Sequence, residues 1–231
     1  MMAGDFFKFP HTPHLAWLST SPSRQDKVLS PAEVRELLSG EVLVEEKVDG
    51  ANVGISVDPA GELRAQNRGS YLGTRAHPQF QPLWPWLESR RERLVQALGS
   101  HLILFGEWCF AVHSVHYEAL PDWFLAFDVY DRCAGHFWSS QRRDALVEAL
   151  GLARVPVIAR GRFSLEDIEK LLGPSRISLA PMEGLYVRRD QGEFLKARAK
   201  LVRPEFIQAV EEHWSSRPLQ RNRLLAGGAT P

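Results

Sequence analysis

The chain has no net charge, few cysteines and no long apolar run. Its 231 residues carry 28 basic and 28 acidic side chains, so any site for a polyanion must be local. Cys109 and Cys133 are too few for a disulfide framework and lack metal-ligand spacing. No segment reaches membrane-spanning length, and the N-terminus lacks a signal-peptide core. These absences predict a soluble, cytoplasmic protein without membrane contact.

Lysine is also scarce, since only six lysines accompany a large excess of arginine. One of them, Lys47, ends a predicted strand and is followed by Asp49 and Gly50. A lysine beside carboxylates and a tight turn suits a covalent catalyst, provided that its site lowers the pKa of the amine. The Lys-x-Asp-Gly pattern alone is weak evidence, because a strand followed by a turn produces it by chance.

The order of predicted elements indicates one α+β domain built on antiparallel sheets flanked by helices. Hydrophobic residues make up 44% of the chain, enough to support a core. We expect an irregular N-terminal arm over 1–27, the domain over 28–214 and a flexible tail over 215–231. Strands are predicted near 42–48, 53–57, 62–66, 101–108, 122–130, 155–158, 183–189 and 193–199. Helices are predicted near 30–40, 82–98, 140–150, 164–172 and 204–214.

Five further motif-like segments follow the lysine segment 47–50 in a fixed order. They are 66–70 with Arg68, 105–108 with Glu107, 124–129 with Phe127, 183–187 with Glu183, and 195–198 with Lys196 and Arg198. Each segment is short, but the six together, in this order, make a specific signal.

These segments resemble the motifs of the covalent nucleotidyltransferase superfamily, which contains ATP-dependent DNA and RNA ligases and mRNA capping enzymes. The closest resemblance is to the RNA ligase 2-like branch, in which Asn52 also has a counterpart. The best-known pattern of that branch has histidine where this chain has Asp49, which is usual in the wider superfamily. The resemblance implies an ATP-grasp-like ligase adenylation domain, with ATP and Mg²⁺ or Mn²⁺ as cofactors.

The resemblance also implies a set of catalytic residues. Lys47 would attack the α-phosphorus of ATP, Glu183 would assist the lysine and bind the metal, and Lys196 would contact phosphate. Lys196 and Arg198 alternate along one predicted strand, so both would face the nucleotide and lower the pKa of Lys47. Lys200 continues this alternation and would replace Lys196 if the register were shifted by two residues.

Five further residues would bind the nucleotide or the strand end according to the same resemblance. Glu107 would bind the ribose hydroxyls, and Phe127 would stack on adenine. Arg68 is a candidate for the ribose and the RNA end, because its planar guanidinium suits phosphates and hydroxyls. Asn52 would contact the adenylate or the reactive end, and the backbone of Glu46 would read the adenine edge.

The segment after Arg198 separates the members of the superfamily. DNA ligases and capping enzymes normally carry an OB-fold there, whereas this chain offers only a predicted helix and a short tail. The first expectation is therefore a monomeric RNA ligase without an OB-fold. It would join RNA 5′-phosphate and 3′-hydroxyl ends through lysyl-AMP and an adenylated RNA end. The alternatives are a minimal ATP-dependent DNA ligase and a non-catalytic nucleic-acid-binding domain on the same fold.

Overall fold

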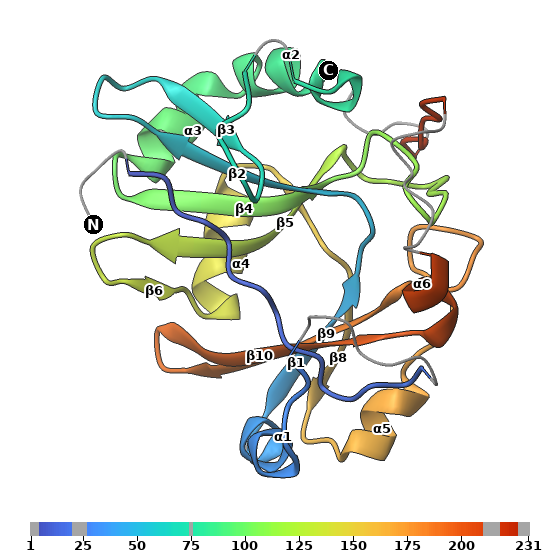
Figure 1. Ribbon diagram of the computed structural model, residues 1–231. Helices are drawn as coiled ribbons and strands as arrows, with labels where there is room; N and C mark the ends of the chain where they lie inside the picture. Colours follow the sequence, from blue (N-terminus) through green and yellow to red (C-terminus); the bar gives the residue numbers. More distant parts are fainter. Residues whose placement is uncertain (1–4, 20–26, 74–75, 210–217, 226–231) are drawn as a thin grey trace.

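Two sheets form the frame of the protein, whose computed structural model describes residues 5–19, 27–73, 76–209 and 218–225 (Figure 1). The larger sheet has the order β3-β2-β4-β5-β6, with β7 paired to β5, and the smaller has the order β10-β9-β1-β8. All pairings are antiparallel except that of β7 with β5. The strands are β1 Val42–Lys47, β2 Ala51–Val57, β3 Leu63–Gln66, β4 Leu102–Trp108, β5 Phe124–Asp131, β6 His136–Phe137, β7 Ala153–Arg154, β8 Val157–Gly161, β9 Gly184–Gln191 and β10 Phe194–Val202.

Helices cover each sheet on the side where its apolar residues gather. The helices are α1 Pro31–Leu38, η1 Pro78–Phe80, α2 Leu83–Glu88, α3 Arg91–Leu98, α4 Ser140–Ala149, α5 Leu165–Lys170 and α6 Pro204–Ala209. Leu83 and Leu94 of α2 and α3 join the core of the larger sheet, whereas Leu37 and Ile168 of α1 and α5 join that of the smaller. The predicted α+β class with antiparallel sheets and flanking helices is confirmed. In the described ranges, no helix is both long and apolar enough to span a membrane.

Two predicted elements are wrong in their extent. The single helix predicted over 82–98 is split into α2 and α3. Ser89 donates its hydroxyl hydrogen to the carbonyl of Trp86, and Arg90 leaves helical geometry, with φ −121° and ψ 4°. The strand predicted over 155–158 is replaced by the short strands β7 and β8. Between them stands Pro156, which has no N–H to give to a sheet.

The N-terminal arm packs onto both sheets where it is described. Phe7 stacks on Tyr130, with ring centroids 3.7 Å apart, and Phe9 is buried. Farther on, Leu15 donates its N–H to the carbonyl of Lys200, at the edge of β10. The arm therefore runs from the larger sheet to the smaller one, as its path in Figure 1 shows. Residues 20–26 of the predicted arm lie outside the described residues.

The predicted C-terminal tail includes a segment that is also attached to the domain. Residues 218–225 bridge to Ala111 and Leu120, and Asn222 is buried. These residues pack on the domain in place of the flexible tail expected from the sequence, because their backbone bonds and buried asparagine hold them there. The predicted helix 204–214 is described only over α6, and its remainder lies outside the described residues.

Candidate active site

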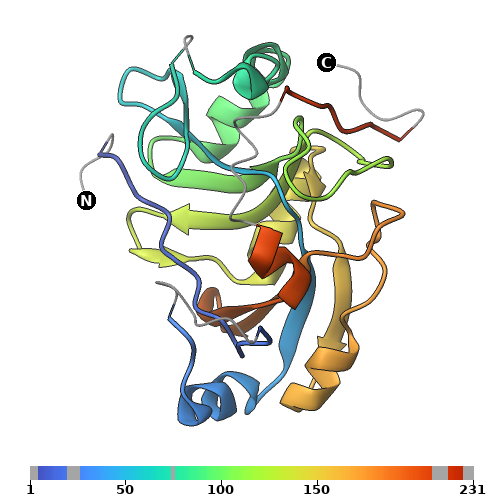
Figure 2. The ribbon, with the colours of Figure 1, turned by 45° about the vertical axis from the view of Figure 1, so that its right-hand side comes forward.

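Lys47 is the last residue of β1, where the chain leaves the smaller sheet for the larger one (Figure 2). Its Nζ lies 2.6 Å from Oε2 of Glu183, and both side chains are largely buried. Lys47 pairs with Gly184 across the sheet, which brings Glu183 to the lysine. A Cβ at Gly184 would lie 2.2 Å from the carbonyl oxygen of Leu201, so a glycine is required for β9 to pass this close to β10.

The turn after Lys47 is held by the loop that follows β4. The carboxylate of Asp49 accepts the N–H of Ser114 at 2.6 Å and that of Val115 at 3.1 Å. The backbone N–H of Asp49 donates to the hydroxyl of Tyr117 at 2.7 Å. A Cβ at Gly50 would lie 2.8 Å from the backbone of β4, which explains the glycine of the motif. The Asp and Gly of the motif therefore fix the turn.

Two of the predicted nucleotide contacts face each other across the larger sheet, and a third lies in the turn after β3. Asn52 on β2 is opposite Glu107 on β4. Arg68 lies in the turn 67–70, which the N–H of Asn67 closes by donating to the carbonyl of Ser70, and the charge of Arg68 acts on Glu107. Oδ1 of Asn52 is buried and finds no hydrogen-bond partner among the described residues. A buried acceptor in this state fits a ligand with hydroxyl or amino donors.

Carboxylates dominate the electrostatics around Lys47. Burial lowers the pKa of Lys47, but the charges of Glu183, Asp49 and Glu107 outweigh it and leave the pKa above its usual value. Burial raises the pKa of Glu107 to about 8, although Lys47 and Arg68 oppose it. Burial also raises the pKa of Glu183 to about 7 against the effect of Lys47. The prediction that this site lowers the pKa of Lys47 is therefore wrong for the structure described.

Lys196 lies away from Lys47. A β-bulge between Leu195 and Ala197 interrupts the pairing of β10 with β9, and Lys196 pairs with Glu36 of α1 at 3.4 Å. Lys47 on β1 pairs with Gly184 on β9, and Gly184 pairs in turn with Val202 on β10, so these three residues form one row across the smaller sheet. Lys196 lies six residues before that row, about 20 Å along the strand at about 3.3 Å per residue. The expectation that Lys196 faces the nucleotide is wrong, because the pairing of β9 with β10 places Lys196 six residues from the residue that lies level with Lys47.

Lys200 and Arg198 have different surroundings on the same strand. Lys200 is two residues from Val202, and its charge acts on Glu183, whose pKa is raised by burial. Arg198 pairs with the buried carboxylate of Asp128, and its guanidinium lies 4.5 Å from the ring centroid of Phe9. The structure therefore brings Lys200 to the site and uses Arg198 inside the protein, against the expectation of a phosphate contact.

Glu46 and Phe127 have structural contacts in addition to their predicted roles. The carboxylate of Glu46 accepts the hydroxyl of Ser175 at 2.6 Å and the N–H of Arg176 at 2.8 Å, so it anchors the loop before β9. Burial raises the pKa of Glu46. Phe127 is the extra residue of a β-bulge in β5 and is half-buried. A bulge beside a site redirects a side chain, which suits the proposed contact of Phe127 with a base.

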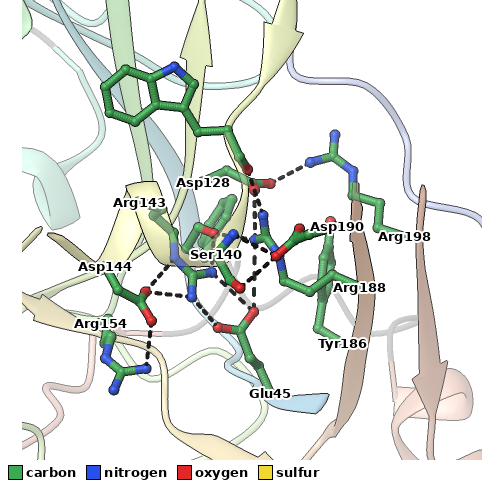
Figure 3. Close-up of polar contacts among 12 residues, drawn as sticks. Glu45, Asp128, Ser140, Arg143, Asp144, Arg154, Tyr186, Arg188, Asp190 and Arg198 are labelled. Carbon is green, nitrogen blue, oxygen red and sulfur yellow. Dashed lines mark hydrogen bonds and ion pairs between the residues drawn. The ribbon is translucent and has the colours of Figure 1, made fainter. Parts of the chain in front are cut away.

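A buried ionic network joins the two sheets behind these residues (Figure 3). Arg143 of α4 donates to both oxygens of Glu45, at 2.7 and 3.2 Å, and to the carbonyl of Phe127 at 2.7 Å. Arg188 of β9 donates to the same carbonyl at 2.9 Å and to Asp128 at 2.9 Å. Glu45 precedes Lys47 by two residues, so the network ties the lysine strand to the strand of Phe127.

The sequence analysis did not identify this network or Tyr117. Arg143 lies in the helix predicted near 140–150, and only the fold brings it to Glu45. One signal was present: the adjacent acids Glu45 and Glu46 stand in a strand that is otherwise apolar. Buried carboxylates need partners, so such a pair predicts basic or polar groups elsewhere in the chain.

The comparison with protein families matches a region that contains all six motif segments. Residues 40–202, well over half of the chain, match the model of the family described as RNA ligase. The chain belongs to the RNA ligase family. No curated protein sequence matches the chain.

Solved RNA ligases from Naegleria gruberi share the fold. A mutant with ATP and Mn is 21% identical, has a TM-score of 0.63 and covers 77% of this chain. The same ligase with PPi is 22% identical, has a TM-score of 0.60 and covers 78% of this chain. Another mutant, with AMP and Mn, is 19% identical, has a TM-score of 0.60 and covers 87% of this chain. The matches cover 54%, 54% and 63% of those chains, so this RNA ligase family member spans a little over half of their length.

Proposed function

We propose that this protein is an ATP-dependent RNA ligase that joins a 5′-phosphate to a 3′-hydroxyl through a lysyl-AMP intermediate. The observation that carries the proposal is the contact of Lys47 with Glu183 where the two sheets meet, in a chain of the RNA ligase family. The Naegleria structures with ATP, AMP and PPi support ATP as the nucleotide donor.

In the first step, the neutral amine of Lys47 attacks the α-phosphorus of ATP. A nitrogen–phosphorus bond forms, the bond from the α-phosphorus to the pyrophosphate oxygen breaks, and pyrophosphate leaves. Glu183 is the proposed acceptor of the amine proton, because its Oε2 lies 2.6 Å from Nζ. Lys200 is the cation proposed to offset the charge that develops on the phosphates.

The nucleotide would lie between the polar side chains of Asn52, Glu107 and Arg68 and the bulge of β5. Glu107, Asn52 and Arg68 offer the acceptors and donors that ribose hydroxyls and phosphates require. Phe127 offers a half-buried ring for a base, and two arginines fix its backbone. The backbone of Glu46 stays the proposed reader of the adenine edge.

The residues present fit a divalent metal, for which Glu183 would be the protein ligand. The described residues hold no group of three or more His, Cys, Asp or Glu that could bind an ion by themselves. Mg²⁺ does not require one, because it commonly binds one or two carboxylates together with substrate phosphates and water. Bound there, Mg²⁺ or Mn²⁺ would offset charge on the leaving pyrophosphate, and its positive charge would lower the pKa of the Lys47 amine.

Two further steps complete the proposed reaction. AMP passes from Lys47 to the 5′-phosphate of an RNA strand, and the 3′-hydroxyl then attacks that phosphate and expels AMP. We expect an RNA 3′-hydroxyl end to be preferred, because its ribose 2′-hydroxyl offers a donor and an acceptor that DNA lacks. Arg68 and Asn52 are the candidates for this contact.

A sealing assay on matched duplex nicks tests the proposal. The protein, ATP and Mg²⁺ are incubated with nicks that differ only in whether ribonucleotides or deoxyribonucleotides supply the 3′-hydroxyl. Faster sealing of the ribonucleotide nick supports the RNA ligase. Equal rates, or faster sealing of the all-DNA nick, would identify a minimal DNA ligase instead. Absence of both sealing and a protein–AMP adduct would leave the non-catalytic binding domain.

A further inference from the structure

The described C-terminal segment, residues 218–225, lies along the loop that follows β4, as the ribbon shows (Figure 2). Asn222 is at its centre and is only 3% exposed. Its side-chain amide donates to the carbonyls of Cys109 at 2.8 Å and Ala111 at 3.1 Å, and its Oδ1 accepts the N–H of Tyr117 at 2.9 Å. This one side chain therefore joins both ends of the loop 109–117.

Backbone bonds reinforce the same attachment. Asn222 donates its N–H to the carbonyl of Phe110, and Arg223 donates to that of Tyr117. Leu120 and residue 224 form a bridge at the end of the segment. A buried asparagine with all three contacts satisfied fixes its neighbours, because any displacement would leave buried polar groups without partners.

The loop in turn holds the segment of the nucleophile. The phenol of Tyr117 is fully buried and accepts the N–H of Asp49 at 2.7 Å. Ser114 and Val115, in the same loop, donate to the carboxylate of Asp49. Asp49 is two residues from Lys47. A chain of contacts thus leads from Asn222 through Tyr117 and Asp49 to the lysine.

We propose that residues 218–225 are a positioning element for the nucleophile, with Asn222 and Tyr117 as the positioning residues that set the turn after Lys47. The inference rests on the proposed function for its catalytic consequence. Asn222 acts through the loop, so it affects how Lys47 meets the α-phosphorus, while the residues proposed to bind ribose and base stay in place. Misplacement of a reacting group by about 1 Å can cost on the order of 10²-fold in rate.

The test uses the full chain and three variants: Asn222→Ala, Tyr117→Phe and the double variant. Formation of the protein–AMP adduct is followed at several ATP concentrations, together with the denaturant midpoint of each variant. Each single variant should lower the rate at saturating ATP by about 10-fold or more, with the half-saturating ATP concentration within about 3-fold of wild type. The matched control is Leu225→Ala, since Leu225 belongs to the same segment but is 57% exposed.

The double variant decides whether the two residues act in one chain. If Asn222 works through Tyr117, the double variant should be about as slow as the slower single variant. The inference would be overturned if the rate losses of the two single variants multiplied in the double variant. It would also be overturned if the losses only matched the fraction of protein that is unfolded, or if Leu225→Ala were as slow as Asn222→Ala.

A measurement without activity separates this inference from the proposed function. Hydrogen exchange at the amide of Asp49 should be faster in folded Asn222→Ala than in wild type, whether or not an adduct forms. Unchanged exchange there would overturn the positioning role. A wild-type protein that forms no adduct would overturn the proposed function, while the exchange result would still decide the structural linkage.

Discussion

The two lysines of β10 allow a direct comparison, because Lys196 and Lys200 differ by four residues on one strand. Lys200 lies two residues from the row of Lys47, about 7 Å along the strand, whereas Lys196 lies about 20 Å away. Screening at physiological salt acts over about 8 Å, so the charge of Lys196 is more than two such lengths distant. Lys196 also pairs with Glu36.

We therefore expect opposite results from two alanine substitutions. Lys200→Ala should lower the rate of adduct formation by about 10²-fold, the scale for loss of one contact to developing charge. Lys196→Ala should change the rate by less than about 2-fold, since Lys196 makes an exposed ion pair far from the site. The assay is single-turnover labelling with α-labelled ATP, with Lys196→Ala as the matched control. A Lys196→Ala protein as slow as Lys200→Ala would refute the register of β9 with β10 on which this comparison rests.

Three other substitutions test the electrostatics of the site. The pKa of Glu107 is about 8 in the folded protein, so the folded state holds a proton that the unfolded state loses above pH 4.5. The contribution of Glu107 to the free energy of unfolding should therefore fall by up to about 1.4 kcal/mol per pH unit as the pH rises towards 8. Glu107→Gln should remove this pH dependence of the free energy of unfolding, measured by denaturant titration. Arg143→Met should cost about 3–5 kcal/mol by removing the closer of the two arginines that pair with buried Glu45, the other being Arg188 at 3.9 Å. Adding Glu45→Gln to Arg143→Met should recover part of that loss, and no recovery would contradict a direct ion pair.

Local sequence signals predicted most of the fold. Ser30 and Ser164 form capping boxes at the starts of α1 and α5, the helices predicted near 30–40 and 164–172, and the strands predicted near 183–189 and 193–199 pair as β9 and β10. Apolar periodicity and caps act over a few residues, so they can be read directly from the chain. The split of the helix over 82–98 could not be read in this way, because it depends on one hydroxyl bonding to a carbonyl of its own helix.

The candidate site was predictable where its residues lie in contiguous motifs. Lys47, Glu183, Glu107 and Asn52 come together as the order of motifs implied. The phosphate contact was misassigned to Lys196 because alternation gives only the face of the strand, whereas the pairing of β9 with β10 decides which lysine lies near Lys47. Asn222, Tyr117 and Arg143 could not be found from the sequence, since each acts through partners that are distant along the chain.

The identity of the nucleophile is the central claim, and mapping the AMP adduct tests it most directly. Wild-type protein and Lys47→Ala are incubated with α-labelled ATP and Mg²⁺, denatured, digested and analysed by mass spectrometry. The account predicts one AMP group, on Lys47, joined by a phosphoramidate that acid cleaves, and no adduct on the folded Lys47→Ala variant. An adduct on any other residue, or undiminished labelling of Lys47→Ala, would contradict it.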